Sequence, residues 1–155
     1  MPRKIRMLHL ANQVYESMTP RPLIVYKNIK SALYSIPEDT IILSKTPEND
    51  RDGIMFLHEL IHAAGSPARM NIPITDVCRE EVVAYVASAL GYTKVNGSRF
   101  TIKCTPRDEW EMKLICHDAW NRLKYLIGDE MWAKLYPCKL MYSKAGDSFV
   151  SARIR

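Results

Sequence analysis

The chain has 155 residues and a mass of 17.9 kDa, a length that fits one domain and allows an apolar core to form without disulfides. Apolar residues make up 47% of the chain and charged residues 25%, which excludes disordered and fibrous classes. The net charge is +5, and the basic excess lies in residues 92–155, because residues 1–91 contain ten basic and ten acidic side chains.

The N-terminal third is expected to contain one amphipathic helix and three short strands. Apolar residues spaced three and four apart predict a helix over residues 3–18. Short apolar and β-branched runs predict strands over residues 23–26, 31–36 and 40–43. These strands are expected to form a small mixed or antiparallel sheet.

Four more helices are predicted in the rest of the chain. Their expected ranges are 53–64, 76–91, 108–127 and 129–136. Asp76 is a plausible N-cap of the second, and Gly91 is expected to end it. The dipeptide Asn96-Gly97 is typical of a two-residue turn, so it predicts a hairpin between strands over residues 92–95 and 99–104. The mixture of elements predicts the α+β class.

No apolar run approaches the roughly 18 residues that a membrane-spanning helix needs, so no membrane partner is expected. The N-terminus lacks the apolar stretch of a signal peptide. The four cysteines are dispersed and form no CxxC pair. These features favour a soluble protein in a reducing compartment, namely the cytoplasm.

The predicted helix over residues 53–64 contains the motif His58-Glu59-Leu60-Ile61-His62. Histidines four positions apart project from one helical face, so both imidazoles can bind one Zn²⁺. Glu59 follows the first histidine and is predicted to be the general base that activates water for attack on a carbonyl group. From this composition an accidental HExxH has a probability on the order of half a percent, so the motif predicts a zinc site.

A catalytic zinc needs a third protein ligand. The longer motif HExxHxxGxxH is excluded, because its last position is Ala68, which has no donor atom. The remaining candidates are Glu81, Glu80, His9, Asp76 and His117. Glu81 is preferred, because the 19 residues after His62 allow the chain to turn and return antiparallel to the first helix. Glu80 lies about 100° round the helix and is expected to be a surface or salt-bridging charge.

Tyr85 is the second predicted catalytic residue. The run EVVAY over residues 81–85 has the shape Glu-x-x-Ala followed by a polar residue, which many zincins with a glutamate ligand present. The hydroxyl of Tyr85 is predicted either to hydrogen-bond a metal ligand or to point at the oxyanion.

Four segments carry a resemblance to a known family: YSIPEDTIIL (34–43), HELIHAAG (58–65), RM (69–70) and REEVVA (79–84). Within residues 23–91 they look like the zincin-like metallopeptidase domain of ArdC-type antirestriction proteins and of phage and plasmid polyvalent proteins. The resemblance implies that His58, His62 and Glu81 bind metal and that Glu59 is the base. Proteins of that family have an Arg a few residues after the glycine that follows the helix. Arg69 matches this position, and the resemblance assigns it no role.

The chain differs from this family at two positions and in one domain. Ser66 stands where the family usually has His, and Tyr85 stands where it usually has a second acid. The family's upstream domain for single-stranded DNA has no counterpart in residues 1–155.

The expected fold is therefore a single minimal zincin-like domain over residues 1–155. Its small sheet would pack on the HExxH helix and on a second, ligand-bearing helix. Residues 23–91 would form the metal-site core, and residues 92–155 would complete the core or the cleft. The predicted function is zinc-dependent hydrolysis of peptide bonds in a peptide or protein, with the substrate paired to an edge strand over residues 40–43.

The alternative is a zincin fold that serves as a binding or antirestriction module of a phage or plasmid. Such a module would act by contact with a host protein or with single-stranded DNA, in the host cytoplasm if the chain is phage-encoded. The changes at Ser66 and Tyr85 favour it, and so does the basic segment 92–155, which would contact nucleic acid or an acidic partner.

Overall fold

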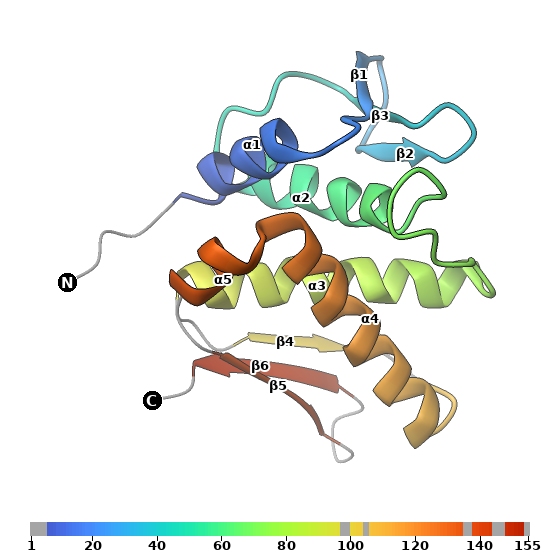
Figure 1. Ribbon diagram of the computed structural model, residues 1–155, viewed down its shortest axis with the longest axis vertical. Helices are drawn as coiled ribbons and strands as arrows, with labels where there is room; N and C mark the ends of the chain where they lie inside the picture. Colours follow the sequence, from blue (N-terminus) through green and yellow to red (C-terminus); the bar gives the residue numbers. More distant parts are fainter. Residues whose placement is uncertain (1–5, 97–99, 104–105, 135–137, 144–147, 154–155) are drawn as a thin grey trace.

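The computed structural model describes residues 6–96, 100–103, 106–134, 138–143 and 148–153 (Figure 1). The helices are α1 (Met7–Ser17), α2 (Asp50–Ala64), α3 (Val77–Asn96), α4 (Glu109–Ile127) and α5 (Asp129–Lys134). The strands are β1 (Leu23–Tyr26), β2 (Leu33–Ser35), β3 (Thr40–Leu43), β4 (Phe100–Lys103), β5 (Cys138–Ser143) and β6 (Ser148–Arg153). The predicted α+β class is confirmed. None of these helices combines the length and apolar character needed to cross a bilayer.

The first sheet has the strand order β1-β3-β2. β1 runs parallel to β3 and β2 runs antiparallel to it, so the predicted mixed sheet is confirmed. β3, however, is the central strand, and the prediction that it is an edge strand available to a substrate is wrong. Both of its edges are used by neighbours that pack it into the core, where Ile41 is fully buried. The edges of this sheet are β1 and β2.

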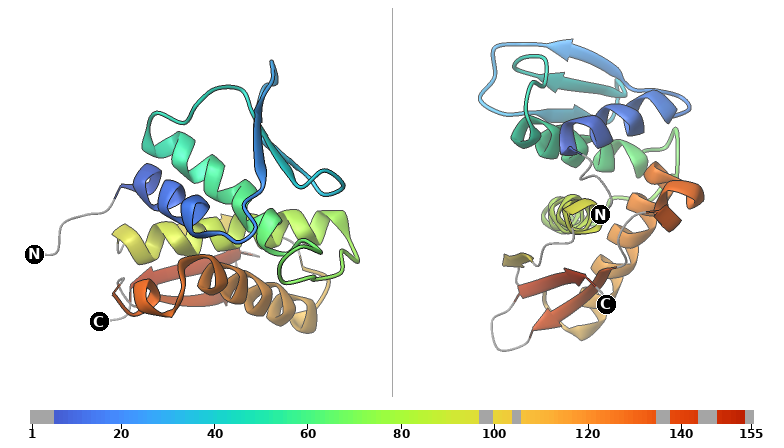
Figure 2. Two further views of the ribbon diagram at one scale, coloured as in Figure 1. Left: turned by 45° about the horizontal axis from the view of Figure 1, so that its top comes forward. Right: turned by 90° about the vertical axis from the view of Figure 1, so that its left-hand side faces the viewer.

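Helix α3 lies in the middle of the molecule (Figures 1 and 2). It packs against α2 on one side, and against α4 and the second sheet on the other. α2 and α3 run in opposite directions (Figure 1), as the spacing between the motif and Glu81 predicted. Their facing apolar side chains belong to one buried cluster, which includes Leu57 and Ile61 of α2 and Val83 and Ala87 of α3. This packing sets the separation between the two helices.

Helix α3 continues five residues beyond Gly91, so the predicted helix end and the predicted strand over residues 92–95 are wrong. Gly91 is a point of close contact between helices, because a Cβ there would lie 3.2 Å from Leu57 Cδ2 and 3.4 Å from Leu123 Cδ1. Thr93 and Val95 in the added turn are buried. Their burial outweighs the roughly 1 kcal/mol that glycine costs inside a helix.

The second sheet is antiparallel and has the order β4-β6-β5. Phe100–Lys103 pairs with the last strand, not with the segment before Asn96. The predicted turn at Gly97 and residues 98–99 and 104 of the predicted hairpin lie outside the described residues. No element was predicted over residues 138–155, where β5 and β6 form because each supplies the other's backbone partners.

The other helix predictions agree with the structure to within a few residues. Asp108 caps α4 by accepting a hydrogen bond from the Glu111 backbone N–H at 2.8 Å. Asp76 caps α3 in the same way, through the Cys78 N–H at 2.8 Å. The ends of the predicted ranges 3–18 and 129–136 include residues outside the described part of the chain.

Candidate metal centre

Helix α2 places the motif in its last two turns. The helix is capped by Asn49, whose side chain accepts a hydrogen bond from the Asp52 N–H at 2.9 Å. Leu57, Leu60 and Ile61 are fully buried, which fixes the rotation of the helix about its axis. The imidazoles of the two motif histidines consequently face α3.

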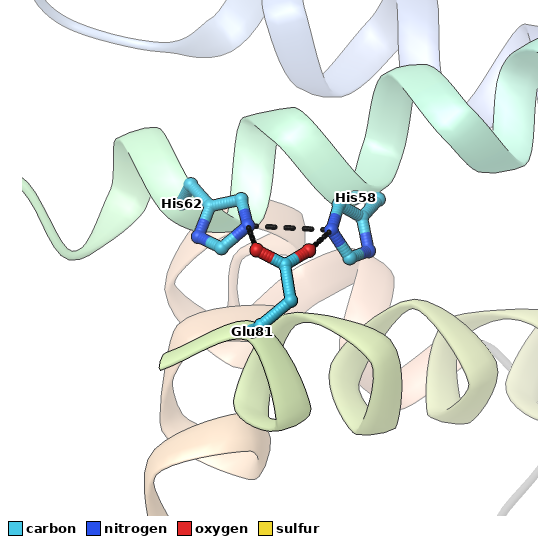
Figure 3. Close-up of side chains that lie close together, drawn as sticks. All are labelled: His58, His62 and Glu81. Carbon is cyan, nitrogen blue, oxygen red and sulfur yellow. Dashed lines mark hydrogen bonds and ion pairs between the residues drawn. The ribbon is translucent and has the colours of Figure 1, made fainter. Parts of the chain in front are cut away.

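The two histidines meet Glu81 of α3 (Figure 3). Glu81 Oε1 lies 2.6 Å from His58 Nε2, and its Oε2 lies 3.3 Å from His62 Nε2. The two Nε2 atoms lie 3.2 Å apart. One ligand atom from each residue falls within 4.8 Å of the others, so the structure brings the three predicted ligands together.

The spacing of these atoms can be compared with that of a tetrahedral metal site. Bonds of about 2.0–2.1 Å at tetrahedral angles put neighbouring ligand atoms about 3.3 Å apart. The contact between the two histidines and the contact between His62 and Glu81 match this value. The contact of Glu81 with His58 is shorter, but the Glu81 side chain is 48% exposed and has room to move. Two imidazoles and one carboxylate can therefore hold a divalent cation with one position open.

Glu80 is mostly buried, with a side chain that is 13% exposed, so the expectation of a surface charge is wrong, although the expectation of a salt bridge is confirmed. Its Oε1 lies 3.2 Å from His62 Nδ1, and both of its oxygens accept hydrogen bonds from Arg122. Burial alone would raise the pKa of Glu80, but the hydrogen bonds from His62 and Arg122 lower it to about 2. Ionised Glu80 therefore accepts the Nδ1–H of His62, which leaves Nε2 of the neutral ring for a cation.

Arg122 is the residue of this site that the sequence analysis missed. It comes from α4, is fully buried, and also donates hydrogen bonds to both oxygens of Asp118, at 2.7 and 3.1 Å. The only local signal is a pair of opposite charges four residues apart, which is typical of exposed helices. The partner across the core, Glu80, is 42 residues away in the sequence, so only the tertiary structure reveals the connection.

Glu59 has a different environment from the other two glutamates. It is 7% exposed, and among the described residues it has no hydrogen-bond or ion-pair partner. The pKa of Glu59 is raised to about 7, mainly by burial; His62 opposes this rise and the negative charge of Glu81 adds to it. A carboxyl group with a pKa near neutrality can both take and return a proton.

Tyr85 packs against the first histidine. The two ring centroids lie 4.5 Å apart, and the ring planes are tilted by 56°. The Tyr85 side chain is 53% exposed, and within the described residues its hydroxyl makes no hydrogen bond to His58, His62 or Glu81. The predicted hydrogen bond from Tyr85 to a metal ligand is therefore not seen. The other predicted role, a contact with the oxyanion, stays a prediction.

Two cavities flank the triad, as we call the three candidate ligands His58, His62 and Glu81. One has a volume of about 280 Å³ and lies beside His62, and the other has a volume of about 220 Å³ and lies beside His58. Both are lined by Ala32, Glu59 and Glu81, so they meet at the site. Five residues in and around β2 also line one or both of them: Ser31, Ala32, Leu33, Tyr34 and Ile36. The edge strand of the first sheet thus forms one wall of a cleft that passes the triad.

Arg69, to which the sequence analysis assigned no role, links two turns of the chain through its buried side chain. It donates hydrogen bonds to both oxygens of Asp39, at 2.8 and 3.0 Å, and to the Pro20 carbonyl. It also donates to Ser66 Oγ at 2.8 Å, so the serine at the departing position is part of this link. Arg69 therefore joins the turn after α2 to the turn between β2 and β3, and holds the β2 wall in place.

The other candidate ligands lie away from the triad. Asp76 caps α3, as described above. His9 is exposed on α1 and lines a groove with Leu126. His117 is exposed on α4 and is hydrogen-bonded to Asn121. None of them belongs to the cluster that could hold a metal.

Comparison with known proteins found no match: no family model, no curated protein and no solved structure is similar to this chain at a significant level. The resemblance to the ArdC-type domain therefore stays a prediction.

Proposed function

We propose that the protein is a zinc-dependent hydrolase that cleaves peptide bonds, built as a minimal zincin-like domain related to the ArdC-type metallopeptidases. The observation that carries this proposal is the convergence of His58, His62 and Glu81 beside Glu59, which is buried and has no partner among the described residues. Two imidazoles and one carboxylate are the protein ligands of many catalytic zinc sites.

In this proposal Glu59 performs the proton transfers. Bound Zn²⁺ would supply a Lewis acid that polarises the substrate carbonyl and lowers the pKa of water. Glu59 takes the proton of the attacking water and then delivers it to the nitrogen of the leaving amine. Glu59 lines the cavities on both sides of the metal position, so its carboxylate is placed to take the proton on one side and return it on the other.

The surrounding residues orient these groups. Glu80, held by Arg122, keeps the His62 ring turned so that Nε2 faces the metal position. Tyr85 packs on the His58 ring and lines the cavity on that side. We propose that its hydroxyl donates a hydrogen bond to the developing oxyanion.

The substrate strand would pair with β2, in place of the predicted strand over residues 40–43. β2 pairs with β3 along one edge, and no other described strand uses its second edge. That edge belongs to the segment that lines both cavities. An extended peptide added there would gain backbone hydrogen bonds and cross the triad.

Two variants test the proposal. Glu59→Gln should bind one zinc ion, as the wild type does, and lose hydrolysis of a peptide mixture, because Gln cannot accept the proton. His58→Ala should lose the zinc, measured by metal analysis after dialysis. Undiminished cleavage by Glu59→Gln would refute the mechanism, and full zinc content in His58→Ala would place the metal elsewhere.

One observation favours a second function, that of a binding or antirestriction module. Residues 92–155 carry twelve basic and seven acidic side chains. If this segment contacts phosphates of single-stranded DNA, the binding constant should fall steeply as salt is raised. Zinc binding with hydrolysis and without DNA binding would favour the hydrolase, whereas DNA binding without hydrolysis would favour the module.

A further inference from the structure

We infer that the two cavities are side-chain subsites on opposite sides of the scissile bond, and that both select bulky apolar residues and reject acidic ones. This inference rests on the proposed peptide hydrolysis and adds the substrate class. If this inference holds, the enzyme cuts apolar segments of a polypeptide, which are buried in folded proteins and become accessible when a protein unfolds.

The cavity beside His62 has an aliphatic wall drawn from separate parts of the chain. Leu33 and Ile36 come from β2 and the turn after it, Ile74 precedes α3, and Val77 begins α3. All four are exposed to solvent, and Val77 is 76% exposed. Aliphatic side chains that converge in one hollow while open to water are typical of a binding site.

The cavity beside His58 has a second apolar wall. Ile54 and Met55 of α2 form one side, and the ring of Tyr85 forms another. Met55 and Tyr85 are exposed. The two cavities therefore have similar chemistry, although the residues that build their walls are different.

The acidic side chains that line the cleft disfavour acidic substrates. Glu59 and Glu81 line both cavities, Glu80 lines the one beside His62, and no Lys or Arg is among the described residues lining either. The proposed metal would be occupied by its protein ligands and the reacting carbonyl. A substrate carboxylate farther into either cavity would therefore be close to these acids with no Lys or Arg among the described lining residues to pair with, which disfavours its binding. The basic segment 92–155 suggested an acidic partner, but the cleft has the opposite preference.

The dimensions favour an extended chain over a small molecule. Each cavity, at about 280 and 220 Å³, is smaller than the roughly 300–1,000 Å³ of small-molecule sites. Ser31 and Ala32 line the cavity beside His58, and Leu33, Tyr34 and Ile36 extend along the other. A strand lying along β2, with about 3.3 Å per residue, would place successive side chains on either side of the triad.

The experiment compares cleavage sites in a mixture of peptides of known sequence, using zinc-loaded wild type, Val77→Asp and Met55→Asp. The wild type should cut between bulky apolar residues. Each variant should raise the relative kcat/KM for Lys or Arg over Leu by about tenfold or more, at one side of the scissile bond only. The side should differ between the two variants, because each new carboxylate lies in one cavity.

Leu23→Asp is the matched control. Leu23 is an exposed apolar residue of β1, in the first sheet, and it lines neither cavity, so its replacement should leave the cleavage profile unchanged. Val77→Asp should fold, because an acidic residue in the first turn of α3 interacts favourably with the helix dipole. A wild-type preference for acidic residues, no preference at all, or a change on the same side in both variants would overturn the inference.

A binding measurement separates failure of the subsites from failure of the proposed hydrolysis. Glu59→Gln, loaded with zinc, should bind a fluorescent hexapeptide with two central leucines about tenfold more tightly than one with two central aspartates. Val77→Asp in the same background should reduce that ratio. Equal affinities would overturn the subsite inference even if the wild type hydrolyses peptides. Apolar selectivity without hydrolysis by the wild type would uphold the subsites and refute only the hydrolase.

Discussion

Gly65 and Arg122 occupy one small volume between α2 and α4. A Cβ at position 65 would lie 2.6 Å from Cζ of Arg122 and 2.8 Å from its Nη1. The glycine that ends the motif helix is therefore needed for space, because the guanidinium lies against its backbone. From there Arg122 reaches Glu80, which holds His62, so a residue of the C-terminal half helps to orient the metal site.

Gly65→Ala should test this contact directly. The methyl group has to push Arg122 away from Glu80, so we expect a loss of about 1–3 kcal/mol in unfolding free energy and a higher Kd for zinc. Urea denaturation and competition with a chelator measure the two effects.

Gly53→Ala is a suitable control for this prediction. Gly53 lies in α2, as the motif does, and a Cβ there would lie 2.5 Å from the backbone N of Leu8 in α1 and would not contact Arg122. The substitution should lower stability and leave the zinc Kd unchanged. An unchanged Kd in Gly65→Ala as well would show that the position of Arg122 does not affect the metal site.

The pair of Arg122 and Glu80 should be strongly coupled. Arg122→Met leaves two partly buried carboxylates, Glu80 and Asp118, without their buried cation, which should cost about 3 kcal/mol of unfolding free energy. Adding Glu80→Gln removes one of the two charges and should restore part of that loss. A double-mutant cycle by urea denaturation measures the coupling, and strict additivity of the two substitutions would contradict a direct interaction.

The two adjacent glutamates should affect metal binding to different degrees. Glu80→Gln removes the charge that supports the His62 ring and pairs with Arg122, but it leaves all three proposed ligands, so it should weaken zinc binding by about 10–100-fold while retaining one site. Glu81→Gln removes a proposed ligand and should weaken it much more. Isothermal titration calorimetry compares the two variants, and the reverse order would make Glu80 the ligand.

The ion pair between Arg69 and Asp39 predicts a pH dependence of stability. Partial burial opposes ionisation of Asp39, but hydrogen bonds from Arg69 and Tyr34 outweigh it and hold the pKa below the ordinary value of 3.8. A carboxylate with a lower pKa in the folded state stabilises the protein above its unfolded pKa. That contribution disappears as the pH falls through the folded pKa.

Asp39→Asn is the variant that measures this contribution. Asparagine tolerates the left-handed backbone at this position, where φ is 47°, so the change removes mainly the charge. The difference in unfolding free energy between wild type and variant should be largest near pH 7 and should shrink below about pH 4. A difference that stays constant from pH 7 to pH 3 would show that the charge of Asp39 contributes nothing.

The sequence by itself determined the features that depend on local pattern. His58, Glu59 and His62 share a helix, so their periodicity and spacing alone predicted one face with two imidazoles. The strands over residues 23–26 and 40–43 were also predicted with the bounds that the structure has, because short β-branched runs between turn residues have few alternatives.

Only the tertiary structure decided the features that depend on contacts between distant residues. The extension of α3 past Gly91 depends on packing against Leu57 and Leu123, and the order of the first sheet depends on which strands pair. Whether Glu80 is a surface charge or a support for His62 depends on Arg122, 42 residues further along the chain. Local propensity carries no information about such partners, because burial of a charge becomes favourable only where the fold brings its counter-charge to it.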